Sequence, residues 1–185
     1  MTKVLRYLQG TREYVITYNK GGGVQGLEAY VDSDWGQNIE SKRSVTGNLI
    51  TWNGNLLNWS TRKQACVALS SAEAELISFC SCVCEGLWFQ RLLKDLETNC
   101  QKMEVFEDNQ ACIAIINNPG KMKRVKHLDI KLKFITEKVA AGLINITYIP
   151  SHLQVADLLT KSLNKVKFKF LVSKIFNKQF SEEEC

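Results

Sequence analysis

The sequence predicts an α/β domain, with a mixed β-sheet that carries helices on its faces. The first third of the chain holds strand-like runs, whereas from Ser70 onward apolar residues recur at three- and four-residue steps. The predicted order is β-β-β-α-β-α-α-β-α, and an antiparallel start followed by strands separated by helices requires a mixed sheet of five strands. With 185 residues, 45% of them hydrophobic, the chain is long enough to bury the core of one such domain.

The first strands surround a strong turn signal. A strand over residues 27–31 leads into the polar turn Asp32-Ser33-Asp34, and two more strands are expected over 46–52 and 55–61. Asn53-Gly54 separates these two, and both residue types tolerate positive φ. The pair therefore predicts a β-hairpin.

The second half begins with a long helix. Ser70 or Ser71 can cap its first turn, and its apolar period continues to about Leu96. Proline and glycine at Pro119-Gly120 end a later helix, and Gly142 ends another. The remaining elements are expected as a strand over 103–106, a helix over 108–117, a helix over 125–141, a strand over 144–149 and a short helix over 155–163.

The composition limits the classes of protein to which the chain can belong. Twenty-four basic and 19 acidic residues give a net charge of +5, which suits a solvated surface or an anionic partner such as nucleic acid. The seven cysteines are odd in number and lie mostly in apolar sequence, so a reducing compartment and packing roles are expected. No run approaches the roughly 18 uninterrupted apolar residues of a membrane span, so no membrane partner is expected.

Four acidic residues stand where the predicted elements begin or end. Asp32 and Asp108 follow strands, Glu75 lies in the first turns of the long helix, and Asp157 opens the last one. Carboxylates at the carboxyl ends of strands converge on one rim of an open α/β sheet. Such a cluster needs cations, and its oxygen ligands suit magnesium or manganese. Taken singly, each acid is better explained as a surface charge, and Asp108 and Asp157 also as helix caps.

Several motifs, in this order and spacing, resemble the ribonuclease H domain of copia-type retrotransposon Pol polyproteins. They cover the chain from about Val4 to Leu163. The motifs are Ala29–Trp35, Lys42–Gly47, Asn58–Gln64, Ala68–Ile77, Glu107–Gln110, Lys126–Asp129, Tyr148–Ser151 and Ala156–Lys161.

The resemblance implies a ribonuclease H-like fold and a metal-dependent endonuclease that cuts the RNA strand of RNA/DNA hybrids. It implies two Mg²⁺ or Mn²⁺ ions on Asp32, Glu75, Asp108 and Asp157. Glu75 is preferred to Glu73 because the Glu-Leu-Ile that it begins matches the family's catalytic glutamate. Asp34 is the alternative to Asp32.

Two other functions remain open. The first is a diverged remnant that binds nucleic acid without cutting it. The second is an integrase or transposase, which shares the fold but typically carries a zinc-binding His/Cys module that this sequence lacks.

The resemblance also suggests how the chain is organised. Residues 1–24 are expected to be the tail of the reverse-transcriptase or connection region, 25–163 the ribonuclease H-like domain, and 164–185 a C-terminal extension. Within the N-terminal part, a helix is expected over 3–9 and a strand over 13–18. The expected partners are an RNA/DNA hybrid and the reverse-transcriptase portion of the same polyprotein, in the cytoplasm within a virus-like particle or in the nucleus.

Basic and polar residues are candidates for contacts with the hybrid, because lysine and arginine neutralise phosphates and polar side chains contact 2′-hydroxyls. His152 is interpreted as either a proton shuttle or an exposed loop residue, and packing or hydrogen bonding is favoured over chemistry for His127. The candidate nucleic-acid contacts are Lys42, Arg43, Ser44, Arg62, Lys63, Asn109, Gln110, Lys123 and Arg124.

Overall fold

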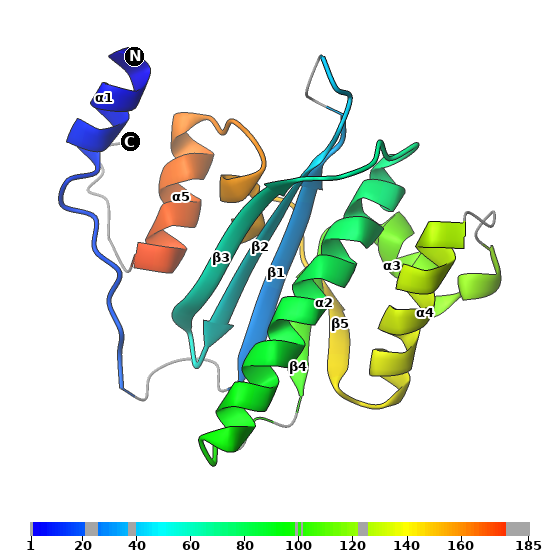
Figure 1. The fold of residues 1–185 in the computed structure, drawn as a ribbon. Helices are drawn as coiled ribbons and strands as arrows, with labels where there is room; N and C mark the ends of the chain where they lie inside the picture. Colours follow the sequence, from blue (N-terminus) through cyan, green and yellow to red (C-terminus); the bar gives the residue numbers. More distant parts are fainter. Residues whose placement is uncertain are drawn as a thin grey trace.

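A computed structural model describes residues 2–20, 26–36, 40–98, 100, 102–121 and 126–176. Within it, five strands form one sheet in the order β3-β2-β1-β4-β5 (Figure 1). Strands β1 and β2 and strands β2 and β3 pair antiparallel, whereas β4 pairs parallel with both β1 and β5. The predicted mixed sheet is confirmed. The strands are β1 Leu27–Asp34, β2 Val45–Trp52, β3 Asn55–Lys63, β4 Met103–Glu107 and β5 Ile144–Tyr148.

The predicted hairpin is present between β2 and β3. Asn53 and Gly54 both adopt positive φ, 49° and 75°, which matches the twist of the flanking strands. The first strand is longer than predicted, because Asp32, Ser33 and Asp34 continue β1 and pair with β2 down to Val45. Asp32 thus lies inside the central strand, and the predicted polar turn is wrong.

The helices follow the predicted order. Ser70 is the N-cap of α2, and its hydroxyl accepts a hydrogen bond from the backbone N–H of Glu73. Gly142 follows α4 with φ of 68°, as expected of a residue that ends a helix. The helices are α1 Thr2–Gly10, α2 Ser71–Asp95, α3 Gln110–Asn117, α4 Lys126–Ala140 and α5 Lys165–Phe176, with short 3₁₀ helices η1 Pro119–Lys121 and η2 Val155–Leu159.

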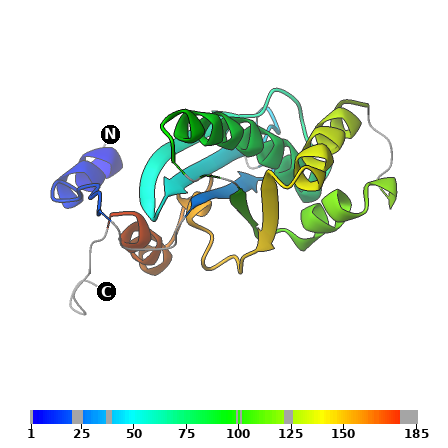
Figure 2. The same ribbon diagram turned by 90° about the horizontal axis from the view of Figure 1, so that it is seen from below.

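The larger core lies between the sheet and the helices α2, α3 and α4. Leu27, Ala29 and Val31 of β1 face this side and pack with Phe79 and Leu76 of α2. Figure 2 shows α2 and α4 on one side of the sheet and α5 on the other. By length and composition α2 is apolar enough to cross a membrane, but 56% of its most apolar stretch is buried inside the protein, as in the core helix of a globular domain.

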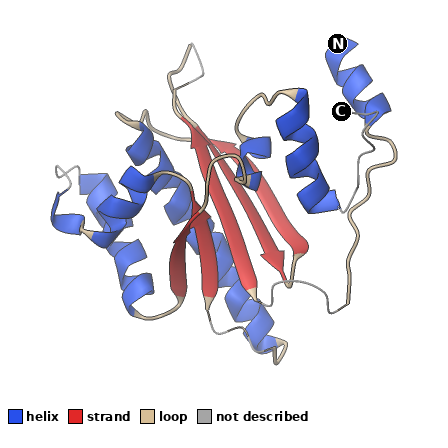
Figure 3. Ribbon diagram, turned by 180° about the vertical axis from the view of Figure 1, so that it is seen from behind, coloured by secondary structure: helices blue, strands red, loops and turns tan. Residues whose placement is uncertain are grey.

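A smaller core covers the opposite face of β1, β2 and β3. It joins Leu49 of β2 and Leu56 of β3 to Val155 of η2 and Leu171 of α5. Figure 3 shows α5 beside the sheet in the view from behind. Residues 165–170 alternate like a strand in sequence, yet they begin helix α5, whose Leu171 is completely buried. Helix α5 therefore packs on the sheet.

The N-terminal strand predicted over 13–18 is wrong. Residues 14–19 form neither helix nor strand, and Val15 and Tyr18 are exposed. A strand-like run needs a neighbouring strand for its backbone hydrogen bonds. This segment instead packs Ile16 against the core cluster of Leu49 and Leu56, and the Asn19 N–H donates to Asn55 Oδ1 at 2.7 Å. The glycine run Gly21–Gly23 lies outside the described residues.

Candidate metal centre

Three carboxylates meet at the carboxyl ends of the two central parallel strands. Asp32 is on β1, Asp108 directly follows β4, and Glu75 is on α2 above them. One carboxylate oxygen from each residue lies within 4.8 Å of those of the other two. Asp32 and Glu75 are buried, and Asp108 is half-buried. Because β1 and β4 run in the same direction and pair from Leu27 to Tyr30, their ends reach the same edge of the sheet.

The start of α2 fixes Glu75. The preceding turn is closed reciprocally, since Glu73 Oε2 accepts the backbone N–H of Leu69 at 2.8 Å while Ser70 accepts that of Glu73. Buried Gln64, at the end of β3, donates from Nε2 to the carbonyl of Ala74 at 2.9 Å. Glu73 therefore caps the helix, and Glu75, two residues later, belongs to the acidic cluster.

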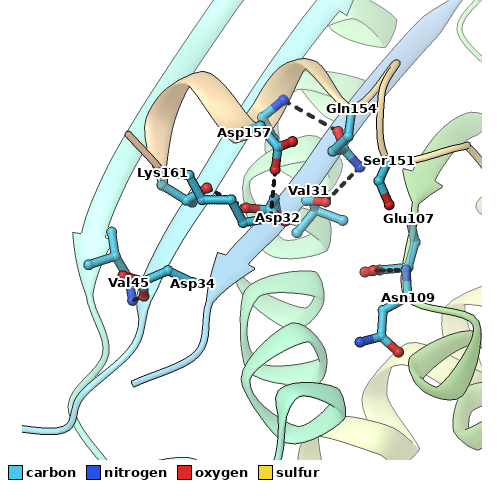
Figure 4. Close-up of polar contacts among 12 residues, drawn as sticks. Val31, Asp32, Asp34, Val45, Glu107, Asn109, Ser151, Gln154, Asp157 and Lys161 are labelled. Atoms are coloured by element: carbon cyan, nitrogen blue, oxygen red, sulfur yellow. Dashed lines mark hydrogen bonds and ion pairs between the residues drawn. The ribbon is translucent and has the colours of Figure 1, made fainter. Parts of the chain in front are cut away.

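The fourth predicted acid, Asp157, lies on η2 beside Asp32 (Figure 4). Lysine 161 joins the two carboxylates: its Nζ lies 2.8 Å from Asp32 Oδ1 and 2.6 Å from Asp157 Oδ1. Thr160 donates to the second oxygen of Asp32, and Lys167 pairs with the second oxygen of Asp157. Asp157 is thus next to the cluster, but its oxygens are engaged by lysines.

Gly47 lets η2 come this close to the sheet. This residue pairs with Asp32 across β1 and β2. A Cβ atom at Gly47 would lie 2.6 Å from Thr160 Cγ2 and 3.1 Å from the carbonyl oxygen of Ala156. Only a residue without a side chain allows η2 to carry Asp157 and Lys161 over this point of β2.

Gln154 anchors the start of η2. Its completely buried side chain donates from Nε2 to the carbonyl of Val31 at 2.9 Å and to that of Phe106 at 3.3 Å. Its Oε1 accepts the backbone N–H of Ala156 at 3.3 Å. One side chain thereby ties η2 to both central strands next to the acids. Sequence analysis missed this residue, and the only local signal is a polar residue just ahead of an apolar turn.

The structure adds a carboxylate that sequence analysis did not select. Glu107, the last residue of β4, is completely buried, and its Oε1 accepts the backbone N–H of Asn109 at 2.9 Å. Its Oε2, like Oε2 of Glu75, is buried without a hydrogen-bond partner among the described residues. A buried carboxylate oxygen without a donor is costly. A cation held by Asp32, Glu75 and Asp108 would satisfy the buried oxygen of Glu75, so these three residues fit a divalent metal ion with oxygen ligands.

Burial shifts the protonation of the cluster. Burial raises the pKa of Asp32 to about 6, although Lys161 acts in the opposite direction. It also raises the pKa of Glu107 to about 8 and, together with the neighbouring charge of Glu107, raises that of Glu75 well above its usual value. Glu107, whose pKa lies above 7, therefore retains its proton at neutral pH unless a cation neutralises it.

The helix-cap interpretation of two acids is wrong. Asn109, not Asp108, is the N-cap of α3, with its Oδ1 accepting the backbone N–H of Cys112 at 3.0 Å. Gln154, not Asp157, is the N-cap of η2. Asp34, the alternative to Asp32, accepts the backbone N–H of Val45 and holds the end of the β1–β2 pair.

The candidate nucleic-acid contacts and the two histidines differ in their exposure and in their position around the acids. Four basic residues, Lys42, Arg43, Arg62 and Lys63, are exposed near the edge where β2 begins and β3 ends. Ser44 is completely buried and its hydroxyl accepts from the backbone N–H of Gly36, whereas Gln110 is exposed. The loop histidine His152 is exposed between β5 and η2. Lys123 and Arg124 lie outside the described residues, and the side chain of His127 is not described.

Sequence comparisons point to retrotransposon polyproteins. No family model matches the chain. It is 33% identical over 166 residues to the Retrovirus-related Pol polyprotein from transposon TNT 1-94 of Nicotiana tabacum, an alignment that covers 90% of the chain and 12% of that protein. It is also 33% identical over 176 residues to the Pol polyprotein from transposon RE1 of Arabidopsis thaliana, covering 95% of the chain and 12% of the relative. The chain thus spans about an eighth of the length of these relatives.

Structure comparisons give the fold. The ribonuclease H1 LC11, isolated from compost, matches with a TM-score of 0.57 and 20% identity over 74% of this chain and 94% of its own. The structure of LC11 in complex with an RNA/DNA hybrid matches with a TM-score of 0.55 and 17% identity, over 72% of this chain and 93% of its own. At these identities the likeness establishes the fold. Together with the polyprotein matches, it shows that the chain belongs to the copia-type Pol polyproteins as a region with a ribonuclease H-like structure.

Proposed function

We propose that the chain is a divalent-cation-dependent ribonuclease that hydrolyses the RNA strand of an RNA/DNA hybrid. The observation that carries this proposal is the meeting of Asp32, Glu75 and Asp108 within 4.8 Å, on a ribonuclease H-like fold. The complex of LC11 with a hybrid supports the choice of substrate. Within the polyprotein, the activity would remove the RNA strand after the reverse-transcriptase portion has copied it.

Each part of the centre has a role in this proposal. Asp32, Glu75 and Asp108 hold the Mg²⁺ or Mn²⁺, and Asp157 supplies a ligand on the η2 side. When bound, two such cations activate a water molecule and stabilise the leaving oxygen, so that no protein nucleophile is needed. The products would end in a 3′-hydroxyl and a 5′-phosphate. The protein's own task is to keep its carboxylates converging, through the N-cap of α2 and the contacts of Gln154 described above.

The basic edge gives the hybrid a place beside the acids. Val45, at the start of β2, pairs with Asp34 of β1 and with Lys63 of β3, so the end of β3 lies at the same edge of the sheet as Asp32. Arg62 and Lys63 are exposed there, and Lys42 and Arg43 precede β2. Phosphate contacts at this edge would orient the hybrid and make its binding depend on salt.

Incubating the purified chain with a labelled RNA/DNA hybrid in Mg²⁺ or Mn²⁺ tests the proposal. A DNA duplex serves as the substrate control, and Asp108→Asn, which keeps the shape of the side chain but removes its charge, as the protein control. Cleavage of the RNA strand alone, abolished in Asp108→Asn, is the expected result. If the folded chain binds the hybrid but leaves it intact with either cation, the nuclease proposal fails in favour of a binding module.

A further inference from the structure

We propose that Lys161 is a built-in cation that occupies the place of the second metal ion, so that the resting chain takes one divalent ion. The inference deepens the proposed function and rests on it. Its basis is the position of Nζ, which bridges Asp32 Oδ1 at 2.8 Å and Asp157 Oδ1 at 2.6 Å. Both carboxylates are almost completely buried, with exposed fractions of 0% and 1%.

The hydrogen bonds divide the acidic centre into two halves. On the η2 side, each carboxylate oxygen of Asp32 and Asp157 accepts a hydrogen bond. Lys161 donates to one oxygen of each residue. Thr160 donates to the other oxygen of Asp32, and Lys167 donates to the other oxygen of Asp157. A metal ion that enters between Asp32 and Asp157 must therefore displace an ammonium group that is already in contact with both.

The other half offers unsatisfied ligands. Glu75 lies on the α2 side of Asp32, and its Oε2 is buried without a hydrogen-bond partner among the described residues. Asp108 completes the group of three acids and is half-buried. An incoming cation gains most here, because it satisfies an oxygen that has no donor and neutralises like charges that are held together. The first divalent ion is therefore expected at Asp32, Glu75 and Asp108.

Backbone contacts around η2 keep Lys161 in this position. Lys161 follows η2 by two residues, and its backbone N–H donates to the carbonyl of Asp157 at 3.1 Å. Thr61 of β3 donates to the carbonyl of Leu159 at 2.8 Å, which fixes the end of η2 on the sheet. The side chain of Lys161 is still 32% exposed, so its ammonium group can leave toward solvent or a substrate phosphate without rearrangement of the core. A second metal ion can therefore displace the Lys161 ammonium group through movement of that side chain alone.

The test counts Mn²⁺ ions by isothermal titration calorimetry on the full chain, for wild type, Lys161→Met and the matched control Lys165→Met, an exposed lysine on α5. Wild type and the control are expected to bind one ion tightly. Lys161→Met is expected to bind a second ion at least about tenfold more tightly than wild type does. In EDTA, Lys161→Met should melt roughly 6 °C or more below wild type, because two buried carboxylates lose their shared cation, and Mn²⁺ should restore the loss.

The outcomes separate the inference from the proposed function. Two ions bound with equal affinity by wild type and Lys161→Met would overturn the role of Lys161 and leave the nuclease proposal standing. No Mn²⁺ bound at the acids by wild type would overturn the nuclease proposal itself. If Lys161→Met does not fold, labelling of wild-type lysines with an amine-reactive reagent decides the question. Lys161 should be protected in EDTA and become reactive at Mn²⁺ concentrations that fill a second position, and protection that persists there would refute the inference.

Discussion

Replacing Glu107 by glutamine should change the pH dependence of stability. Burial raises the pKa of this carboxyl group from 4.5 to about 8, so the folded chain retains a proton that the unfolded chain has released. The stability that the protonated Glu107 contributes is fully present below the pKa that the group has in the unfolded chain. It is lost as pH rises through the pKa of the group in the folded chain. At 1.36 kcal/mol per pKa unit, ionising Glu107 costs the folded state on the order of 5 kcal/mol at pH 9.

Glu107→Gln removes this cost and keeps the acceptor of the hydrogen bond from Asn109. The difference in unfolding free energy between variant and wild type should be small at pH 5 and should rise by about 3 to 5 kcal/mol in favour of the variant by pH 9. Urea unfolding in EDTA at the two pH values measures it. The control is Glu137→Gln, the same substitution at an exposed position of α4.

The outcome that refutes this reasoning is a Glu107→Gln difference that stays constant between pH 5 and pH 9. Such a result would mean that Glu107 is solvated or already neutralised in the folded protein. The same experiment in Mg²⁺ adds a check, because a bound cation lowers the cost of the ionised carboxylates. The advantage of the variant at pH 9 should therefore shrink when Mg²⁺ is added.

Three further predictions concern the surroundings of the acids. Gly47→Ala should destabilise the chain by about 1 to 3 kcal/mol in urea unfolding and lower Mn²⁺ affinity in calorimetry. The reason is that the new Cβ would lie 2.6 Å from Thr160 Cγ2 and push η2 away from the sheet. Unchanged stability and affinity would show that η2 moves freely. Gln154→Leu should cost about 2 kcal/mol or more in urea unfolding, because it leaves the carbonyl of Val31 without its side-chain donor; a neutral effect would show that Gln154 does not anchor η2. Arg62→Gln should weaken hybrid binding and reduce the slope of log affinity against log salt by about 1, as measured by fluorescence anisotropy; an unchanged slope would place the hybrid elsewhere.

Much of the fold follows from local patterns. The Asn53-Gly54 pair predicts the β2–β3 hairpin because few residue pairs accept two positive φ values. Ser70 predicts the start of α2 because its hydroxyl satisfies a free backbone N–H. Asp32 and Asp108 could be brought together from the sequence because parallel strands end at the same edge of a sheet. These features depend on neighbours in sequence or on one general rule of topology.

The remaining features depend on contacts between distant residues. Lys161 stands four residues after Asp157, a spacing visible in the sequence, but its second partner Asp32 lies 129 residues away. Gln154 bonds to Val31 at a separation of 123 residues, and no local pattern encodes this contact. Glu107 continues the alternation that buries Met103 and Val105 of β4. A charged residue on the buried face of a strand was the available signal.

The most direct test of the central claim is the anomalous diffraction of Mn²⁺ in crystals of the chain. The predicted result is a strong anomalous peak from an ion coordinated by Asp32, Glu75 and Asp108. This peak should be lost in crystals of Asp108→Asn. A fully occupied Mn²⁺ elsewhere on the protein, with no peak among these three carboxylates, would contradict the account.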